Sequence, residues 1–160
     1  MTKQRHRVIP RTLCIIKNKN KILLIEYSKR KGDLYGFFNA LGGHIESDEG
    51  IIENAQKEIF EETGLQPETT KLKGIVHINN FFGKKVMMFV TLSETFTADV
   101  IESDEGKLHW VDVDEINLLK IFEDIKIILD KLANSKDTEV FTAKSRFHDD
   151  GSLDFFEFEN

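Results

Sequence analysis

The segment from Gly42 to Leu65, GGHIESDEGIIENAQKEIFEETGL, most constrains the fold because it places acidic side chains at helical spacing just after two glycines. On a helix that turns about 100° per residue, Glu58, Glu61 and Glu62 lie on one face, one turn apart. Like charges at this spacing repel each other and destabilise a helix. A face that served only solubility would mix lysines among the acids, so we expect this one to bind a cation.

The same segment predicts a helix over about residues 50–63. Ser47 or Asp48 can cap its N-terminus. Gly64 suits the position just beyond its C-terminus, and Pro67 follows shortly after. Apolar residues recur at helical spacing, so one face of the helix is expected to pack against the rest of the protein. This apolar stripe consists of Ile51, Ile52, Ala55 and Ile59.

The cation that suits such a cluster is a hard divalent ion with oxygen ligands. Mg²⁺ usually takes one or two protein carboxylates and completes its shell with water and substrate phosphate. The glycines Gly42 and Gly43 let the backbone approach a metal or a phosphate closely, since they carry no Cβ. Together these features indicate a phosphate-handling site with metal-assisted hydrolysis. For the glutamate triplet alone, a solvent-exposed helix face is the competing interpretation.

The rest of the chain alternates short apolar runs with polar turns, which predicts an α/β domain with a mixed sheet. A second helix is expected over 118–133, where apolar residues recur at helical spacing from Ile121 to Leu132. Asp150 and Gly151 form a strong hairpin turn signal. The expected strands are a hairpin within 12–27, two strands over 72–82 and 84–96 joined near Gly83 and Lys84, a strand over 107–113, and a final hairpin within 139–159.

Composition and charge exclude several classes of protein. The chain has 160 residues, 40% of them hydrophobic, which suits one domain over 1–160 with its own core. The formal net charge of −6 argues against binding to a nucleic-acid duplex, which needs a basic face. There is no apolar run of membrane-spanning length and no export signal. The single cysteine, Cys14, cannot form an internal disulfide, so a cytoplasmic protein is expected.

The acidic segment also resembles the signature box of the Nudix hydrolases. That box runs glycine, five residues, glutamate, seven residues, arginine, glutamate, an aliphatic residue, any residue, two glutamates, any residue, glycine and an aliphatic residue. The resemblance implies the Nudix fold, a mixed sheet between helices in an α/β/α arrangement, with residues 43–65 as the catalytic loop, helix and loop. The matching residues are Gly43, Glu49, Glu58, Ile59, Glu61, Glu62, Gly64 and Leu65.

By this resemblance the chain is a hydrolase that requires Mg²⁺, with Mn²⁺ as a substitute. Either Glu61 or Glu62, or else Glu105, is implied as the base that assists the attacking water. Sequence alone does not choose among them. The implied metal ligands are the Gly43 carbonyl and the carboxylates of Glu58, Glu61, Glu62 and Glu105.

One position of the box departs from the family. The arginine that helps to hold the catalytic glutamates is Lys57 here. Lysine keeps the positive charge but lacks the planar, bidentate fork of arginine. We therefore expect weakened or altered catalysis, with Lys57 still positioning the glutamates. A non-catalytic member of the family that senses a nucleotide is the alternative at this point.

The flanking segments resemble those of the MutT-type 8-oxo-dGTP diphosphatases within the family. FFNALGGHIE places Asn39 at the asparagine that hydrogen-bonds the purine. KIFEDIK places Phe122 at the aromatic residue that stacks on the base. Asp124 falls on one of two neighbouring aspartates that read the base edge, and the second aspartate position is Ile125. The remaining implied pocket residues are Thr12 and Lys29.

The chemistry of these side chains is consistent with base recognition. An asparagine offers a donor and an acceptor together, and an aromatic ring offers a stacking platform. A buried aspartate can be protonated and then donate to a base carbonyl. Each residue also has a purely structural explanation: Asn39 as a turn residue, Phe122 as core, and Asp124 as a helix N-terminal acid.

The expected activity is Mg²⁺-dependent hydrolysis of a nucleoside triphosphate to a nucleoside monophosphate and pyrophosphate, with an oxidised purine nucleotide such as 8-oxo-dGTP as substrate. ADP-ribose, a dinucleoside polyphosphate and an unmodified nucleoside triphosphate are the alternative substrates. The expected partner is this small nucleotide, with no nucleic-acid duplex and no membrane. The protein is expected to be a monomer or a homodimer.

Overall fold

The computed structural model describes residues 3–159 and contains eight strands and two α-helices in that part of the chain. Two short 3-10 helices, Lys29–Leu34 and Val113–Leu118, connect some of them. No helix in residues 3–159 is long and apolar enough to cross a membrane. The strands are β1 Ile9–Asn18, β2 Lys21–Tyr27, β3 Phe38–Asn39, β4 Thr69–Phe81, β5 Lys84–Glu94, β6 Gly106–Asp112, β7 Phe141–Phe147 and β8 Leu153–Glu159, and the α-helices are α1 Ile51–Thr63 and α2 Glu123–Asn134.

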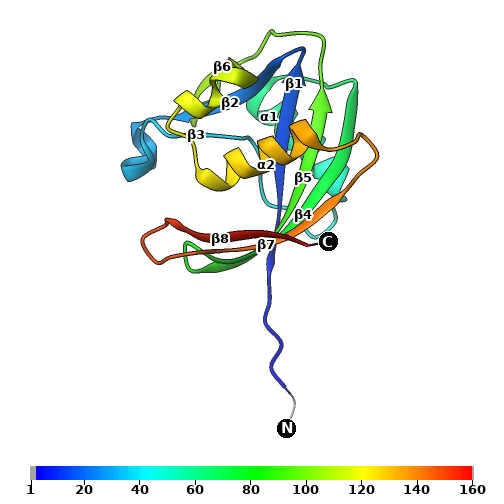
Figure 1. Ribbon diagram of the computed structural model, residues 1–160. Coiled ribbons are helices and arrows are strands. Elements are labelled where there is room, and N and C mark those ends of the chain that lie inside the picture. Colours follow the sequence, from blue (N-terminus) through cyan, green and yellow to red (C-terminus); the bar gives the residue numbers. More distant parts are fainter. Residues whose placement is uncertain (1–2, 160) are drawn as a thin grey trace.

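All eight strands belong to one mixed sheet (Figure 1). Seven of them follow the order β3-β2-β1-β5-β4-β7-β8, and β6 pairs with β2. The β1–β5 and β4–β7 pairs are parallel, and the remaining pairs are antiparallel. The predicted hairpins β1–β2, β4–β5 and β7–β8 are confirmed by their antiparallel pairing.

Strands β1 and β2 lie inside the sheet because both of their faces are apolar, as in a strand buried on both sides. Leu13 and Ile15 of β1 belong to the core cluster that includes Ile125 of α2. Cys14, between them in the chain, belongs to the cluster that includes Ile59 of α1. Since successive side chains of a strand point to opposite faces, α1 and α2 cover opposite faces of the sheet (Figure 1). The predicted α/β/α arrangement is confirmed.

Helix α1 matches the predicted helix except in its N-terminal cap. The N-cap residue is Gly50, whose backbone N–H donates to the Glu53 carboxylate at 3.1 Å. The prediction of Ser47 or Asp48 as the cap is therefore wrong, because the chain enters the helix after this polar cluster. At the other end Gly64 has a φ of 75°, the left-handed conformation that glycine adopts without strain, as predicted.

The prediction of a helix over 118–133 is wrong for its first residues, since α2 begins at Glu123. Ile121 pairs with Phe38 of β3 as an isolated parallel bridge, and the Phe38 N–H donates to the Lys120 carbonyl at 2.8 Å. This pairing requires an extended chain. The pairing also buries Ile121. The prediction assigned this apolar residue to the buried face of the helix, whereas it belongs to the sheet.

The tip of the β4–β5 hairpin is bound to the β7–β8 hairpin. Its turn consists of Phe82 and Gly83, with φ values of 50° and 80°, which a bulky residue such as phenylalanine rarely adopts. The Asn80 amide donates to the Phe147 carbonyl at 3.0 Å and to the Asp149 carboxylate at 2.8 Å. These contacts hold the Phe82 ring, which is largely exposed, at the rim of the cleft described below.

Candidate active site

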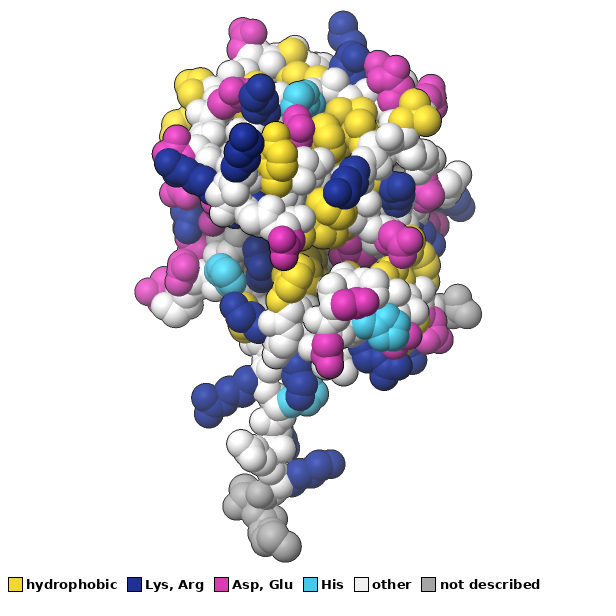
Figure 2. All heavy atoms as spheres, turned by 90° about the vertical axis from the view of Figure 1, so that its left-hand side faces the viewer, with side chains coloured by type: hydrophobic (Ala, Val, Ile, Leu, Met, Phe, Trp, Pro, Cys, Tyr) yellow, Lys and Arg dark blue, Asp and Glu magenta, His cyan; other side chains and the backbone are white. Residues whose placement is uncertain are grey.

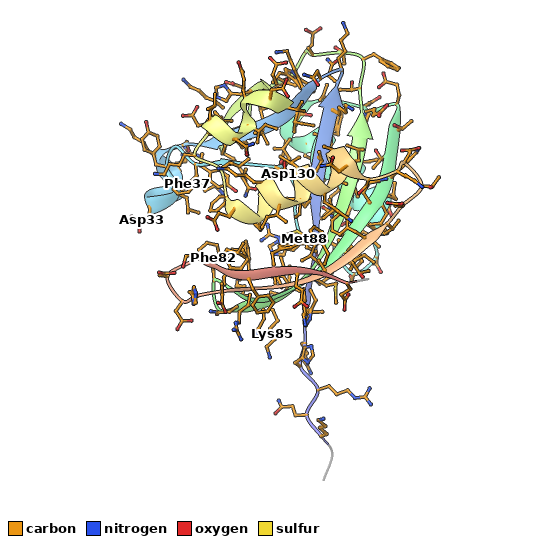
Figure 3. The ribbon with its side chains drawn as sticks, viewed as in Figure 1. Asp33, Phe37, Phe82, Lys85, Met88 and Asp130 are labelled. Carbon is orange, nitrogen blue, oxygen red and sulfur yellow. The ribbon has the colours of Figure 1, made fainter. Side chains whose placement is uncertain are left out.

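A cleft of about 410 Å³ lies across one end of the sheet. Residues of β2 and β3, β1, β5, the β4–β5 tip and the N-terminal end of α2 line it. In Figure 3, Phe82 and Met88, which both line the cleft, lie below Phe37. Figure 2 looks onto the left-hand side of Figure 1, where hydrophobic side chains gather in the middle of the face with charged side chains around them.

The lining residues separate by chemistry into two groups. We call the first the carboxylate end and the second the aromatic end. The carboxylate end consists of Glu58, Glu62 and Glu105, and the aromatic end consists of Tyr27, Asn39, Phe81, Phe122 and Asp124.

The double glycine brings the backbone against α1 and β1. A Cβ on Gly43 would lie 2.4 Å from the carboxyl carbon of Glu58, so any side chain there would displace this carboxylate. A Cβ on Gly42 would lie 2.1 Å from the carbonyl oxygen of Thr12, a clash with backbone. The Thr12 N–H donates to the Gly43 carbonyl at 2.9 Å. The loop is thereby fixed to β1 with Gly43 beside Glu58.

The carboxylate end holds more negative charge than its cations neutralise. Burial raises the pKa of the Glu62 carboxyl to about 8, and the charges of Glu105 and Glu58 add to the effect. Burial and the charge of Glu61 raise the pKa of Glu58. One cation on this side is Lys31, whose Nζ lies 3.8 Å from Glu105 Oε2, and the charge of Lys57 partly offsets the rise in the pKa of Glu58. Ionisation of these acids is opposed, so a divalent cation beside them would be stabilised.

The donor set fits a hard divalent cation that keeps part of its shell for water and phosphate. In residues 3–159, no three His, Cys, Asp or Glu side chains already stand close enough to hold a metal by themselves. Glu58 and Glu62 supply two carboxylates one helical turn apart, and the glycine turn leaves room beside Glu58. One or two carboxylates are the usual protein share of a Mg²⁺ shell.

Lys57 forms an ion pair with Glu49 at the back of the signature segment. Glu49 Oε2 also accepts hydrogen bonds from the Glu46 backbone N–H at 3.0 Å and from Asn54 Nδ2 at 2.8 Å. These partners, with Lys57 first among them, lower the pKa of Glu49 to about 2. Lysine at the arginine position of the family therefore still connects helix α1 to the loop before it.

Asn54 is a structural residue of the site that sequence reasoning did not identify. It is fully buried in α1, its Oδ1 accepts the Thr12 hydroxyl at 2.6 Å, and its Nδ2 donates to the His44 carbonyl at 2.8 Å. Thr12, predicted as a pocket residue, lines the cleft with its hydroxyl engaged in this bond. The available signal was a polar residue beside Ala55 in the apolar stripe of the helix.

At the aromatic end the Asn39 amide is held on both sides. Its Nδ2 donates to the Tyr27 hydroxyl at 2.8 Å, and its Oδ1 accepts the Ala40 N–H at 2.8 Å. One N–H and one lone pair of the amide are left for a ligand. Phe122 lines the cleft and stacks on Phe37 with ring centroids 5.0 Å apart at an interplanar angle of 25°. The predicted stacking residue is thus itself supported by a ring.

Asp124 is buried at the start of α2, with 6% of its surface exposed. Burial raises the pKa of its carboxyl to about 6, even though Oδ1 accepts the Ile125 N–H at 3.0 Å. Below about pH 6 the neutral form predominates and carries an O–H donor. Ile125 lines the cleft beside it, where the MutT-type enzymes have their second aspartate.

Three residues of the predicted site do not line the cleft: Lys57, described above, Glu61 and Lys29. Glu61 is exposed on α1. Lys29 is exposed on the 3-10 helix after β2, and its Nζ lies 6.0 Å from the ring centre of Tyr35. Lys31, two residues further along, lines the cleft instead. Residues 29–31 form a basic run, and the 3-10 turn determines which of its lysines faces the cleft.

Comparison with known proteins agrees with this geometry. A model of the Nudix domain matches residues 7–132. The chain is 34% identical over 113 residues to the uncharacterized Nudix hydrolase YvcI of Bacillus subtilis, a match that covers 68% of each chain. It is 29% identical over 115 residues to an oxidized purine nucleoside triphosphate hydrolase of Danio rerio, covering 71% of this chain and 72% of the relative.

Two further similarities bear on fold and substrate. A 62-residue match at 45% identity to an ADP-ribose pyrophosphatase of Methanocaldococcus jannaschii covers 38% of this chain and 35% of the relative. The crystal structure of a MutT protein from Bacillus halodurans superposes with a TM-score of 0.80 at 26% identity, covering 95% of this chain and 98% of that one. With the domain model spanning most of its length, the chain belongs to the Nudix hydrolases, enzymes that cleave phosphorus-containing anhydrides and generally need divalent cations such as Mg²⁺.

Proposed function

We propose that this Nudix hydrolase cleaves a nucleoside triphosphate to a nucleoside monophosphate and pyrophosphate, and that its substrate is an oxidised purine nucleotide such as 8-oxo-dGTP. Water attacks the α- or the β-phosphorus of the triphosphate. The bond from that phosphorus to the oxygen that bridges the α- and β-phosphates breaks, which releases the monophosphate and pyrophosphate. The proposal also assigns Mg²⁺ as the cofactor, with Mn²⁺ able to replace it.

The observation that carries the proposal is that one cleft joins a carboxylate end to an aromatic end. Glu58 and Glu62 come from α1, whereas Asn39 comes from β3 and Phe122 and Asp124 from the start of α2. A nucleotide has the same two-part character, a polyanionic phosphate chain and a flat base. The similarity to an oxidized purine nucleoside triphosphate hydrolase supports the base assignment.

At the carboxylate end, Glu58, Glu62 and the Gly43 carbonyl would hold the cation, with Glu61 and Glu105 as further ligands. A divalent cation held by these residues would supply neutralisation of phosphate charge and would make the attacking water more acidic. Glu62 is the leading candidate for the residue that takes the proton of the attacking water, because it lines the cleft one helical turn from Glu58. Glu61 and Glu105 are the other candidates.

At the aromatic end, Phe122 would stack on the base and Asn39 would pair with its edge through its free N–H and lone pair. Asp124, when neutral, would donate to a base carbonyl, which is the group that an oxopurine offers. Tyr27 holds the Asn39 amide in one orientation. Binding at this end fixes the triphosphate over the carboxylates, so positioning contributes to the rate as well as to selectivity.

The test is product analysis with the purified full-length chain. 8-oxo-dGTP, dGTP and ADP-ribose are each incubated with the protein in Mg²⁺ and, separately, in chelator. We expect 8-oxo-dGMP and pyrophosphate in Mg²⁺ only, formed faster than the products of the other two compounds. Release of inorganic phosphate instead of pyrophosphate, or equal turnover in chelator, would contradict the proposed reaction.

ADP-ribose is the second candidate substrate, and Ile125 favours it. An isoleucine in the cleft where the MutT-type enzymes have an aspartate removes one group that reads the base edge. The shorter match to an ADP-ribose pyrophosphatase points the same way. AMP and ribose 5-phosphate formed faster than 8-oxo-dGMP would support this candidate and retain the chemistry of the carboxylate end.

A further inference from the structure

Arg11 lies in the cleft without an acidic partner. It precedes Thr12 on β1 and lines the cleft together with Phe81. Its guanidinium carbon lies 5.9 Å from the centre of the Phe81 ring. No ion pair in residues 3–159 involves Arg11. An arginine in a substrate cleft that no carboxylate neutralises is available to a ligand.

One donor of this arginine is also buried and unpaired. The Nε of Arg11 is inaccessible to solvent and has no hydrogen-bond acceptor among residues 3–159. Buried polar groups are nearly always paired, and an exception calls for an explanation. This Nε is closed to solvent, so a ligand in the cleft would pair with the two terminal nitrogens of the guanidinium. Arg11 plays no part in the triphosphate chemistry described above, so its side chain has no role yet.

The surroundings of Arg11 place it with the base and not with the phosphates. Its ring neighbour, Phe81, belongs to the aromatic end. The pKa of the Tyr27 phenol is raised by burial, an effect that the Asn39 hydrogen bond and the Arg11 charge partly offset. Lys31 contacts Glu105 and also lies 5.2 Å from the ring centre of Tyr27, so it stands between the two ends. Arg11 has no such carboxylate contact.

We propose that Arg11 is a specificity-determining residue that reads the carbonyl oxygens of an oxopurine base. The guanidinium has five N–H donors and no acceptor, so it pairs with carbonyl and ring-nitrogen acceptors and opposes an exocyclic amino group. Arginine often reads O6 of guanine together with N7. In 8-oxoguanine N7 carries a hydrogen, so the acceptors open to Arg11 are the carbonyl oxygens O6 and O8. With the free N–H of the Asn39 amide it adds donors to the aromatic end, which favours an oxopurine over adenine. This inference rests on the proposed function.

The test measures binding of monophosphates, so that it does not depend on turnover. Dissociation constants of 8-oxo-dGMP, deoxyinosine monophosphate and dAMP are measured by calorimetry for the full-length protein. Deoxyinosine monophosphate carries a carbonyl where dAMP carries an amine, which isolates the group that Arg11 is proposed to read. The variants are Arg11→Met, Arg11→Lys and, as a control, Arg7→Met, which removes an exposed arginine outside the cleft.

Arg11→Met should weaken binding of both oxopurine monophosphates roughly 10- to 100-fold and leave dAMP nearly unchanged. Arg11→Lys should lie between it and the native protein, and Arg7→Met should match the native protein. Equal weakening of all three nucleotides would assign Arg11 to the phosphate or to the fold and overturn the inference, as would no change at all. A normal binding pattern without hydrolysis of any triphosphate would contradict the proposed function alone.

Discussion

The two ends of the cleft differ in how far their polar groups are satisfied within the protein. At the aromatic end the Asn39 amide has two protein partners and Phe122 is stacked on Phe37. At the carboxylate end Glu58 and Glu62 lie one helical turn apart, and burial raises the pKa of both carboxyls. One end is already organised, whereas the other is stabilised only when a cation joins it. The difference indicates that chemistry and selectivity are separable in this protein.

The largest effect should come from removing one charge at the carboxylate end. We expect Glu62→Gln to lower kcat about 10²- to 10⁴-fold with every substrate that the enzyme accepts, because the proposed proton acceptor and metal ligand is lost. Steady-state kinetics on two substrates measure this. The matched control is Glu61→Gln, where the loss should be smaller because Glu61 is exposed outside the cleft. A larger loss in Glu61→Gln than in Glu62→Gln would make Glu61 the more important of the two. Activity in the variant that carries both substitutions would refute the proposed site.

A change at the aromatic end should act unequally on different substrates. Phe122→Ala removes a stacking contact worth about 1–3 kcal/mol, which corresponds to roughly 5- to 150-fold in kcat/KM for the preferred nucleotide. Hydrolysis of a minor substrate should fall less, so the ratio of the two kcat/KM values is the quantity to measure. The control is Phe96→Ala at a largely exposed phenylalanine outside the cleft. An equal loss on both substrates would show that Phe122 supports the fold instead.

These two ends also differ in how well the sequence predicts them. The carboxylate end is mostly local: Gly43, Glu58 and Glu62 lie within one segment whose helical spacing fixes their relation. The hydrogen bonds that support this segment could not be predicted from the sequence, because the Asn54 bonds to Thr12 and His44 depend on how α1 packs against β1. The sequence therefore predicted the clustered carboxylates but not Asn54, the residue that fixes the neighbouring loop to β1.

The aromatic end is assembled from distant segments by the sheet, and local patterns describe it poorly. Only the resemblance to a known family placed Asn39, Phe122 and Asp124 together. Arg11 was not predicted to line the cleft, because an arginine in a strand next to a basic N-terminal stretch is expected at the surface. Lys29 was chosen where Lys31 lines the cleft, since a 3-10 turn determines which lysine points inward. Sequence periodicity carries no information on either choice.

A smaller effect concerns the charge repulsion that distinguishes the carboxylate end. The folded protein binds the Glu62 proton more tightly than the unfolded chain does, since the pKa rises from 4.5 to about 8. Without metal, the Glu62 contribution to the unfolding free energy therefore falls as the pH rises through this window. A cation relieves the cost, so Mg²⁺ should raise Tm more at pH 8 than at pH 6.

Thermal unfolding with and without Mg²⁺ at these two pH values measures this difference. Mn²⁺ should behave in the same way. In Glu62→Gln the dependence of the Mg²⁺ effect on pH should largely disappear. A Mg²⁺ effect of the same size at both pH values would contradict the raised pKa, and no effect of either cation would contradict the metal site.

The smallest effect is expected at the position where the chain departs from the family. Lys57 and Glu49 form a partly exposed ion pair, and such pairs contribute little to stability. Lys57→Arg should therefore change kcat/KM by no more than roughly fivefold. Lys57→Met should cost more, because Glu49 would lose its charged partner and the loop its attachment. An increase of kcat/KM on the order of 100-fold in Lys57→Arg would show that lysine at this position makes the native protein nearly inactive.

The measurement that tests the account most directly is the ratio of kcat/KM for 8-oxo-dGTP over ADP-ribose, determined for the native protein in Mg²⁺. The account predicts a ratio above about 10, since a base-reading contact typically discriminates by 1–3 kcal/mol. It also predicts that Glu62→Gln lowers both values without changing the ratio. A ratio at or below 1 would contradict the assignment of Asn39, Phe122 and Asp124 to an oxidised purine.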